Sequence, residues 1–271
     1  MSNWKIYSLY YGELGCPKGA LTPGIDADLP FTIPYMGYLI DNGSKKILVD
    51  TGINERFIID GKAWGGFRAQ GGTKYVSDSL AKIGVRPEDI DIVLYTHLHN
   101  DHTGASHLFT KSVHIFQEDE WANLLDPLPS QKIRGDYDPE TIPVLKKMTC
   151  LKIEGSVEIE PGVTTYKTAG HTAGSMSIGV ETNKGLYVLT GDTAILNCML
   201  YPKSSTLTLM DGSKLKITPA PDVYGPAIPS SLVYDHYAWY RSIYLLKTLI
   251  KDEKYALTGH EPSLVNRVFP E

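Results

Sequence analysis

One ten-residue stretch, beginning at position 95, constrains this chain more than any other. The polar residues of this stretch, from His97 to His102, follow the apolar run Ile92–Tyr95, which has the composition of a buried strand. His97 and His99 are two residues apart, so their side chains reach the same side of an extended backbone, and Asp101 and His102 follow the turn. Imidazole nitrogens and carboxylate oxygens are ligands that zinc and related divalent ions take in proteins. The stretch therefore predicts a metal site.

The composition is that of an ordinary globular protein. With 271 residues, 42% apolar and 21% charged, the chain can bury a substantial core. The net charge of −5 and the lack of a long basic run argue against a nucleic-acid partner. No run reaches 18 apolar residues and the N-terminus has no leader pattern, so we expect a cytoplasmic protein that does not enter a membrane. Cys16, Cys150 and Cys198 lie far apart, and we expect free thiols.

Further polar side chains follow expected strands. His171, Asp192 and His260 each come directly after a run with the composition of a β-strand. Strand ends that meet at one sheet edge would bring these side chains to the same place. Asp50 ends an expected hairpin, where it either accepts the second N–H of a metal-bound histidine or caps a turn.

The remaining pattern gives a coarse order of elements. Strands are expected at 4–11, 35–40, 46–49, 92–95, 113–116, 151–153, 157–159, 163–168, 176–182, 185–190 and 254–258. Helices are expected at 76–83, 104–109, 118–125 and 234–251. Segments 12–34 and 57–72 are expected to be irregular pocket walls, and 126–147 a surface excursion. His107 and His114 have no ligand-type neighbours and are interpreted as ordinary structural or surface histidines.

Five motifs occur in the order found in the metallo-β-lactamase superfamily. They are Asp50-Thr51-Gly52, Thr96-His97-x-His99-x-Asp101-His102-x-Gly104, Gly170-His171-Thr172-x-Gly174-Ser175, Gly191-Asp192-Thr193 and Gly259-His260. The resemblance covers about residues 46 to 262. It implies a mixed α/β fold, a four-layer αββα sandwich, formed by one domain over 1–271 with an irregular insertion at about 195–234.

The resemblance also implies a dinuclear metal site. It assigns His97, His99 and His171 to one metal ion and places Asp192 between the two ions. The remaining members of the set, which it assigns to the second ion, are Asp101, His102 and His260. Carboxylates offset the mutual repulsion of two close cations. Two divalent ions are expected, zinc first, with manganese, iron or cobalt open.

Within the superfamily the chain looks most like the N-acyl homoserine lactonases. The chain length, the segment Leu21–Gly24 and the closing segment Arg267–Glu271 carry this likeness. Two positions depart from it. Those lactonases commonly have a tyrosine where this chain has Ile195, and an aromatic residue where it has Asn100. The resemblance therefore transfers the fold and the metal site better than the acyl-homoserine substrate.

The expected function is metal-dependent hydrolysis of a lactone or similar cyclic ester. Hydroxide formed from water between the two cations would attack the carbonyl carbon, and Asp101 would orient it or pass a proton to the leaving oxygen. The expected cavity walls are segments 12–34 and 57–72 and the insertion at 195–234. Their large residues suggest a small-molecule substrate with an apolar or acyl portion, although they could equally pack the loops. They are Trp64, Phe67, Met199, Tyr201 and Tyr224.

Other functions stay open on the same residues. A thioesterase resembling glyoxalase II, a β-lactamase or a small phosphodiesterase would use a similar dinuclear site. Di-iron redox proteins of this fold tend to have a carboxylate at the position of His99, which favours hydrolysis here. Exposed aromatic residues of the insertion could serve a homodimer interface instead of a substrate.

Overall fold

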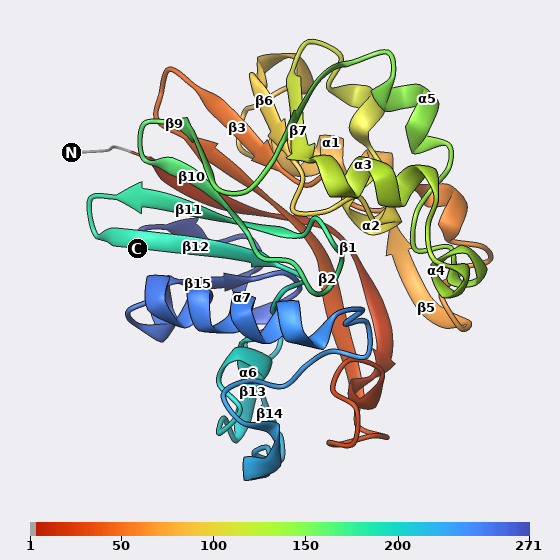
Figure 1. Ribbon diagram of the computed structural model, residues 1–271, viewed down its shortest axis with the longest axis vertical. Helices are drawn as coiled ribbons and strands as arrows, with labels where there is room; N and C mark the ends of the chain where they lie inside the picture. Colours follow the sequence, from red (N-terminus) through yellow and green to blue (C-terminus); the bar gives the residue numbers. More distant parts are fainter. Residues whose placement is uncertain (1–3) are drawn as a thin grey trace.

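Two mixed β-sheets packed face to face form the frame of the molecule (Figure 1). The computed structural model describes residues 4–271. The larger sheet runs, in spatial order, through β4 (Lys62–Ala63), β5 (Phe67–Gly71), β1 (Lys5–Pro17), β2 (Pro30–Asp41), β3 (Lys46–Val49), β6 (Ile92–Leu94), β7 (Val113–Gln117) and β8 (Thr149–Ile153), and β16 (Val268–Phe269) also pairs with β1. The second sheet runs through β15 (Ala256–Thr258), β12 (Gly185–Gly191), β11 (Met176–Thr182), β10 (Val163–Lys167) and β9 (Val157–Glu160).

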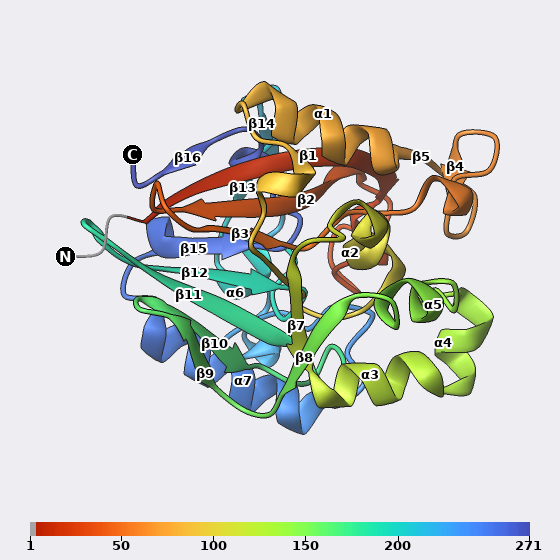
Figure 2. The same ribbon diagram turned by 90° about the horizontal axis from the view of Figure 1, so that it is seen from above.

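Helices cover the outer faces of the sheets. The α-helices are α1 (Thr73–Lys82), α2 (Asn100–Thr103), α3 (Glu118–Leu125), α4 (Pro129–Arg134), α5 (Thr141–Leu145), α6 (Asn197–Leu200) and α7 (His236–Leu249). Short 3-10 turns lie at Lys18–Ala20, Glu55–Phe57, Pro87–Asp89, Ser106–Leu108, Asp222–Tyr224, Glu253–Tyr255 and Pro262–Leu264. Figure 2 shows α1 above the larger sheet and α7 below the smaller one, so the molecule has four layers. The predicted αββα sandwich is confirmed.

Apolar side chains fill each interface between layers. Between the sheets, Ile40 of β2 and Leu94 of β6 are fully buried against Ile178 of β11. The stripe Trp239, Ile243 and Leu246 of α7 packs on the outer face of the smaller sheet, and its spacing of three and four residues is that of an amphipathic helix.

Parallel strands bring the polar loops to one edge. In the larger sheet β3, β6 and β7 pair in parallel, and β12 pairs in parallel with β15 in the smaller one. The segments that follow β3, β6, β12 and β15 carry Asp50, His97, Asp192 and His260. The predicted meeting of strand ends therefore occurs, with both sheets contributing.

The segment 12–34 differs from the prediction. It is not an irregular loop, because β1 and β2 continue their antiparallel pairing as far as Pro17 and Pro30. A register shift between Tyr10 and Gly12 accommodates the glycine, since a bulge tolerates the positive φ of 124° found there. Proline is accepted at strand ends because its missing N–H is not needed there. Only residues 18–29 connect the two strands.

Three other segments also differ in detail. Residues 57–72 contain the short strands β4 and β5. Residues 104–109 contain only a 3-10 turn, and the α-helix lies one turn earlier, at α2. Residues 126–147 are more than a surface excursion, because α4 and α5 lie there and Tyr137 forms a β-bridge with His99.

The two histidines that lack ligand-type neighbours behave as predicted. His114 is buried between the Tyr95 hydroxyl and the Phe109 carbonyl, 2.9 Å from each, and His107 is exposed. Within residues 4–271, none of the helices is both long and apolar enough to cross a bilayer.

Candidate metal centre

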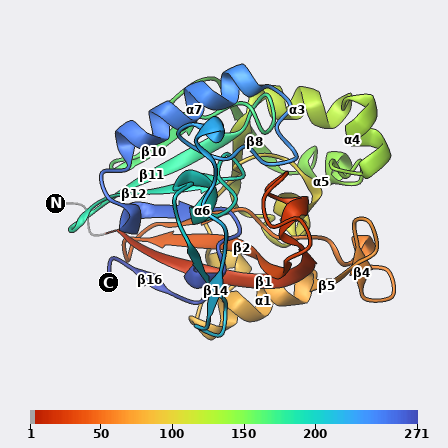
Figure 3. The same ribbon diagram turned by 90° about the horizontal axis from the view of Figure 1, so that it is seen from below.

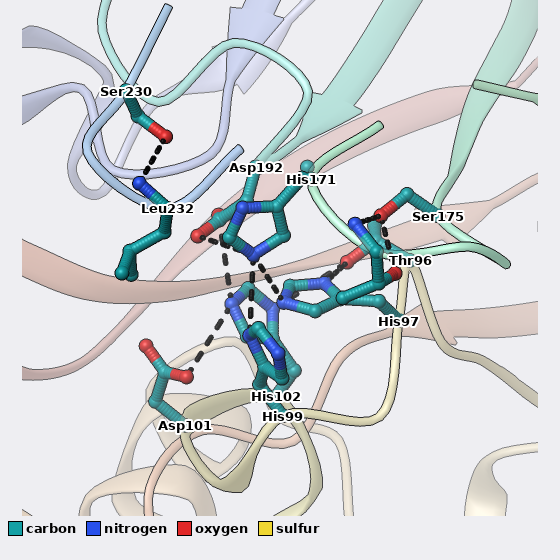
Figure 4. A network of polar contacts seen from close by, with 12 residues as sticks. Thr96, His97, His99, Asp101, His102, His171, Ser175, Asp192, Ser230 and Leu232 are labelled. Atoms are coloured by element: carbon teal, nitrogen blue, oxygen red, sulfur yellow. Dashed lines mark hydrogen bonds and ion pairs between the residues drawn. The ribbon is translucent and has the colours of Figure 1, made fainter. Parts of the chain in front are cut away.

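The seven predicted ligands meet at the edge where the two sheets present their carboxyl ends. Their donor atoms form three overlapping groups, in each of which all atoms lie within 4.8 Å of one another. All seven side chains are buried. Figure 4 shows six of them converging, with Asp101 approaching from α2 and with His171 and Asp192 from loops of the smaller sheet.

The first group is a triangle of histidine nitrogens. His171 Nε2 lies 3.2 Å from His97 Nε2 and 3.1 Å from His99 Nδ1. Ligand nitrogens of a tetrahedral zinc ion stand about 3.3 Å apart, given metal–nitrogen bonds of about 2.0–2.1 Å. Two sides of the triangle therefore have the length that such an ion requires, and the third lies within 4.8 Å.

Asp192 connects this triangle to a second group. Its Oδ2 lies 3.6 Å from His171 Nε2, and its Oδ1 lies 3.1 Å from His260 Nε2. The same Oδ1 is 3.6 Å from His102 Nε2. Asp101 completes the second group, with its carboxylate 3.7 Å from His102 and 3.8 Å from His260. One oxygen of Asp192 thus faces each group, as a bridging ligand would.

These residues fit a pair of divalent cations. Within residues 4–271, two inward-facing atoms, His102 Nε2 and Asp192 Oδ1, are buried without a hydrogen-bond partner. Such atoms are costly to bury unless something satisfies them. Two carboxylates among five imidazoles also supply the negative charge that two adjacent cations need.

The electrostatics of the metal-free site reflect burial and crowding. Burial, and then the neighbouring His102, hold the pKa of His97 well below its usual value. For His102 burial acts in the same direction, but the carboxylates of Asp101, Asp50 and Asp192 outweigh it and raise the pKa to about 10. Burial raises the pKa of Asp101, and the nearby histidines oppose that rise.

Protein oxygens hold the outer nitrogens of two histidines. His102 Nδ1 donates to Asp50 Oδ2 at 2.8 Å, and His260 Nδ1 donates to the Pro34 carbonyl at 2.8 Å. Asp50 also accepts from the Thr96 backbone N–H and hydroxyl. Of the two predicted roles for Asp50, the structure shows the partner of a site histidine. These bonds leave each Nε2 pointing at the other ligands.

Glu120 organises two of the loops and was not predicted. Its carboxylate, fully buried on α3, accepts from the backbone N–H groups of Leu98 and Gly174 and from the hydroxyls of Thr172 and Tyr137. Burial raises its pKa, and these four hydrogen bonds oppose that rise. Glu120 thereby joins the loop of His97 and His99 to the loop of His171. A single glutamate on an amphipathic helix gives no sequence signal for this role.

A glycine allows the His171 loop to approach α7. Gly170 has φ of 137°, and a Cβ there would lie 2.4 Å from Trp239 Cα. Only glycine fits so close a contact at that φ. Gly170, which directly precedes the predicted ligand His171, is thus explained by packing.

A cavity of about 370 Å³ opens onto the centre and is lined by Asp101, Asp192, His99 and His260. The structure places Trp64 and Phe67 in its wall, where apolar side chains surround them. The other apolar lining residues are Leu14, Ala20, Leu21, Ile33, Ile133, Ile195 and Leu232. The remaining lining includes Arg134, Asp136 and Ser231, none of which was predicted.

Three of the residues predicted to bind substrate do not line this cavity. Met199, in α6 of the insertion, is buried in the hydrophobic core. Tyr201 packs on the α7 cluster, with Lys247 over its ring. Tyr224 donates its hydroxyl to the Pro23 carbonyl at 2.7 Å. Large side chains in a long insertion are recruited to hold it in place as readily as to contact a ligand, and sequence spacing does not distinguish the two roles.

The two positions that depart from the lactonase pattern lie in different surroundings. Ile195 lines the cavity and brings no polar atom to it. Asn100 is buried, and its amide donates to the Gly135 carbonyl. The backbone N–H of Asn100 donates to the Asp136 carbonyl at 2.7 Å, so Asn100 connects the segment between α4 and α5 to the loop of His97 to His102.

Comparison with known proteins gives the family. The model of the metallo-beta-lactamase superfamily matches residues 35–260. The chain belongs to this superfamily. Among curated proteins, the N-acyl homoserine lactonase of Bacillus cereus is 32% identical over 198 residues, which cover 70% of this chain and 76% of that protein. The lactonase AttM of Rhizobium radiobacter is 28% identical, over 72% of this chain and 78% of its own.

Solved structures agree with this assignment. An N-acyl homoserine lactone hydrolase with the product N-hexanoyl-L-homoserine at its catalytic metal center superposes with a TM-score of 0.75 and 25% identity, covering 100% of this chain and 99% of that one. AidC, a dizinc quorum-quenching lactonase, has a TM-score of 0.70 at 16% identity, over 96% and 90% of the two chains, and supports the fold. The predicted class, a metal-dependent hydrolase of lactonase type that acts on ester bonds, is confirmed.

Proposed function

We propose that this protein opens the ring of a lactone that carries an acyl portion, and that its seven buried histidine and aspartate residues hold two zinc ions. The observation that carries the proposal is the arrangement around Asp192, whose two oxygens face separate ligand groups. The apolar cavity opens onto the same residues. A polar reaction centre at the end of an apolar cavity suits an ester with a hydrocarbon tail.

The chain's own residues divide the work. When bound, two divalent cations acidify water towards a pKa of about 7 and polarise the ester carbonyl. Asp101 lines the cavity beside the second ligand group, so its carboxylate can accept a proton from the attacking water and deliver it to the leaving oxygen. Trp64, Phe67 and Leu21 supply apolar surface for the acyl portion and exclude water around it.

Other parts of the proposal rest on the sequence. Zinc is favoured because the donors are nitrogen and oxygen and include no cysteine, with manganese, iron and cobalt as competitors. The single domain with its insertion at 195–234, the cytoplasmic location and the homodimer remain predictions. So does the exclusion of nucleic-acid partners.

The test is hydrolysis by metal-loaded protein across one panel of substrates. The panel contains N-acyl homoserine lactones, plain γ- and δ-lactones, a β-lactam, a thioester and a phosphodiester. Asp101→Asn and His260→Ala are assayed in parallel, with metal counted in each, and His107→Ala is the matched control because that histidine is exposed. We expect lactone turnover that falls at least a hundredfold in both site variants and stays within twofold in the control.

Each other result has a defined meaning. If only the thioester, the β-lactam or the phosphodiester reacts, the lactonase proposal is wrong and that substrate class replaces it. If lactones react equally well in the wild-type protein and in His260→Ala, the second ligand group is not part of the reaction centre.

A further inference from the structure

Arg134 stands out among the residues that line the cavity. It is the last residue of α4, and its side chain is 40% exposed. The other lining residues are small, apolar or hydroxyl-bearing, belong to the metal centre, or are Asp136, the ion-pair partner of Arg134. In the part of the chain that the structure describes, Arg134 is the one lysine or arginine in this wall.

The guanidinium group is held in a fixed orientation. Nε donates to Asp136 Oδ1 at 3.2 Å and Nη2 to Oδ2 at 2.7 Å, so the pair is bidentate. The Tyr234 hydroxyl donates to the same Oδ2 at 2.6 Å, and its ring lies 5.5 Å from the guanidinium carbon. A bidentate pair with an aromatic neighbour restricts the planar group, which favours recognition by geometry.

A backbone hydrogen bond connects the Arg134–Asp136 pair to the loop that carries Asp101. The Asp136 carbonyl accepts from the backbone N–H of Asn100, the residue that precedes Asp101. The guanidinium is therefore positioned by the same backbone that positions Asp101.

Part of the guanidinium is left to bind something else. Arginine offers five N–H donors, and the bonds to Asp136 use Nε and Nη2. Within residues 4–271, Nη1 has no hydrogen-bond partner. Ile195 adds no polar atom to the cavity, the Ser231 hydroxyl donates to the Ala20 carbonyl, and Asp136 is bound by Arg134 and Tyr234. Among the described lining residues away from the metal centre, Arg134 thus keeps a side-chain donor for a polar atom of the substrate.

We propose that Arg134 determines specificity by donating through Nη1 to a second acceptor oxygen of the substrate, separate from the ester that is cleaved. The preferred substrate is then a lactone substituted with an amide or a further carbonyl group. A plain alkyl lactone would fill the apolar wall but leave the donor unpaired, which costs affinity. The inference rests on the proposed lactone hydrolysis and extends it to the choice of substrate.

The experiment compares two lactones of similar size that differ in one group. N-hexanoyl homoserine lactone carries an amide, and γ-decalactone carries only an alkyl chain. Both are assayed with metal-loaded wild-type protein, Arg134→Met, Arg134→Lys and the control Lys132→Met. Methionine keeps an apolar stem but has no donor. Lys132 lies on the same helix, and its Nζ pairs with Asp126 on the surface.

We expect kcat/KM for the amide lactone to fall about ten- to a hundredfold in Arg134→Met, mainly through KM, because a hydrogen bond from a charged donor is lost. Turnover of the alkyl lactone should change less than about threefold. Arg134→Lys should recover part of the difference, and Lys132→Met should match wild type. Because Arg134→Met leaves Asp136 without its cation, the double variant Arg134→Met/Asp136→Asn is measured too, with metal content as a check on the site.

The two proposals fail separately. Equal losses for both lactones, in the single and the double variant, would make Arg134 a support for the loop and overturn the specificity role. An unchanged ratio of kcat/KM for the amide and alkyl lactones in Arg134→Met would overturn the specificity role as well. If wild type hydrolyses neither lactone, the proposed function is wrong. The recognition role of Arg134 is then tested by calorimetric binding of the amide lactone to metal-loaded protein. Binding weakened at least tenfold in Arg134→Met upholds the recognition role, while equal or undetectable binding rejects it.

Discussion

At the scale of single residues, Asp50 controls the metal centre without lining the cavity. It accepts from His102 Nδ1 and from Thr96. In Asp50→Asn the amide N–H₂ would face the imidazole N–H, so we expect the affinity for the second metal ion to fall about 10–100-fold. Asparagine is the appropriate replacement because φ at this position is 60°, a conformation that asparagine tolerates. Competition with a chromogenic chelator measures the change.

Asp91 offers a matched control for this substitution. It lies immediately before β6, at the end of that strand opposite to the loop of His97 to His102, and its Oδ2 accepts the Lys46 backbone N–H at 2.8 Å. Asp91→Asn should leave metal affinity within twofold of wild type. Equal metal affinity in Asp50→Asn and wild type would mean that His102 does not depend on this partner.

The site residues that the sequence predicted lie close together along the chain or at the ends of expected strands, whereas Glu120, which it did not predict, reaches the site only through the fold. His97, His99, Asp101 and His102 share one short loop, so spacing alone indicated a ligand group. Glu120 was missed because one helical glutamate gives no local signal. It reaches the site only because the fold brings α3 against the loops that hold Leu98 and Gly174. Pair contacts between distant segments cannot be read from spacing.

At the scale of elements, the connection 18–29 depends on the insertion for its position. Both lie at the same end of the sandwich (Figures 1 and 3). Asp26 accepts from the Thr218 hydroxyl at 2.6 Å, Pro23 from Tyr224 and Ala20 from Ser231. Within the insertion, β13 (Thr206–Thr208) and β14 (Lys214–Lys216) form a separate hairpin. The insertion therefore contributes to the cavity in two ways. Ile195, Ser231 and Leu232 line it, and the hydrogen bonds above hold the loop that carries Leu21.

Thr218→Val should loosen this loop without touching the reaction centre. It removes one charge-assisted hydrogen bond to Asp26 and leaves the backbone bond at 3.0 Å in place. We expect KM for an acyl lactone to rise about two- to tenfold, because Leu21 contributes to the apolar wall, while kcat stays within twofold. Steady-state kinetics over a series of acyl lengths measure both constants.

A second threonine of the insertion provides the comparison. Thr208 accepts from Lys214 within the exposed β13–β14 hairpin, so Thr208→Val should leave both constants unchanged. A fall in kcat with constant KM in Thr218→Val would show that the loop acts on the chemistry and contradict a role in substrate binding. The sequence did not predict that β1 and β2 extend to Pro17 and Pro30 and leave only residues 18–29 as the connection. Glycines and prolines at the ends of strands resemble those of loops, so residues 12–34 looked like one irregular segment.

At the scale of the whole molecule, the metal centre joins the two sheets. The larger sheet supplies the loop of His97 to His102, and the smaller sheet supplies His171, Asp192 and His260. Metal ions held by these residues, as proposed above, would therefore link two halves that are otherwise joined by the apolar core between the sheets. Ligands that bind only the folded state stabilise it in proportion to the logarithm of their concentration over Kd.

Removal of the metal ions should therefore lower the melting temperature. Free metal at a hundredfold excess over Kd contributes about 2.7 kcal/mol, which at roughly 2–4 °C per kcal/mol for a chain of this size is about 5–10 °C. Calorimetry before and after chelation measures the shift, and His260→Ala, which lacks one ligand, should show a smaller one. Hydrogen exchange should rise in the loops around His97 and His171, while the Trp239–Leu246 stripe of α7 stays protected because its apolar packing does not involve the ligands. A uniform rise across both sheets would mean that the metal ions stabilise the core as a whole rather than the edge where the sheets meet.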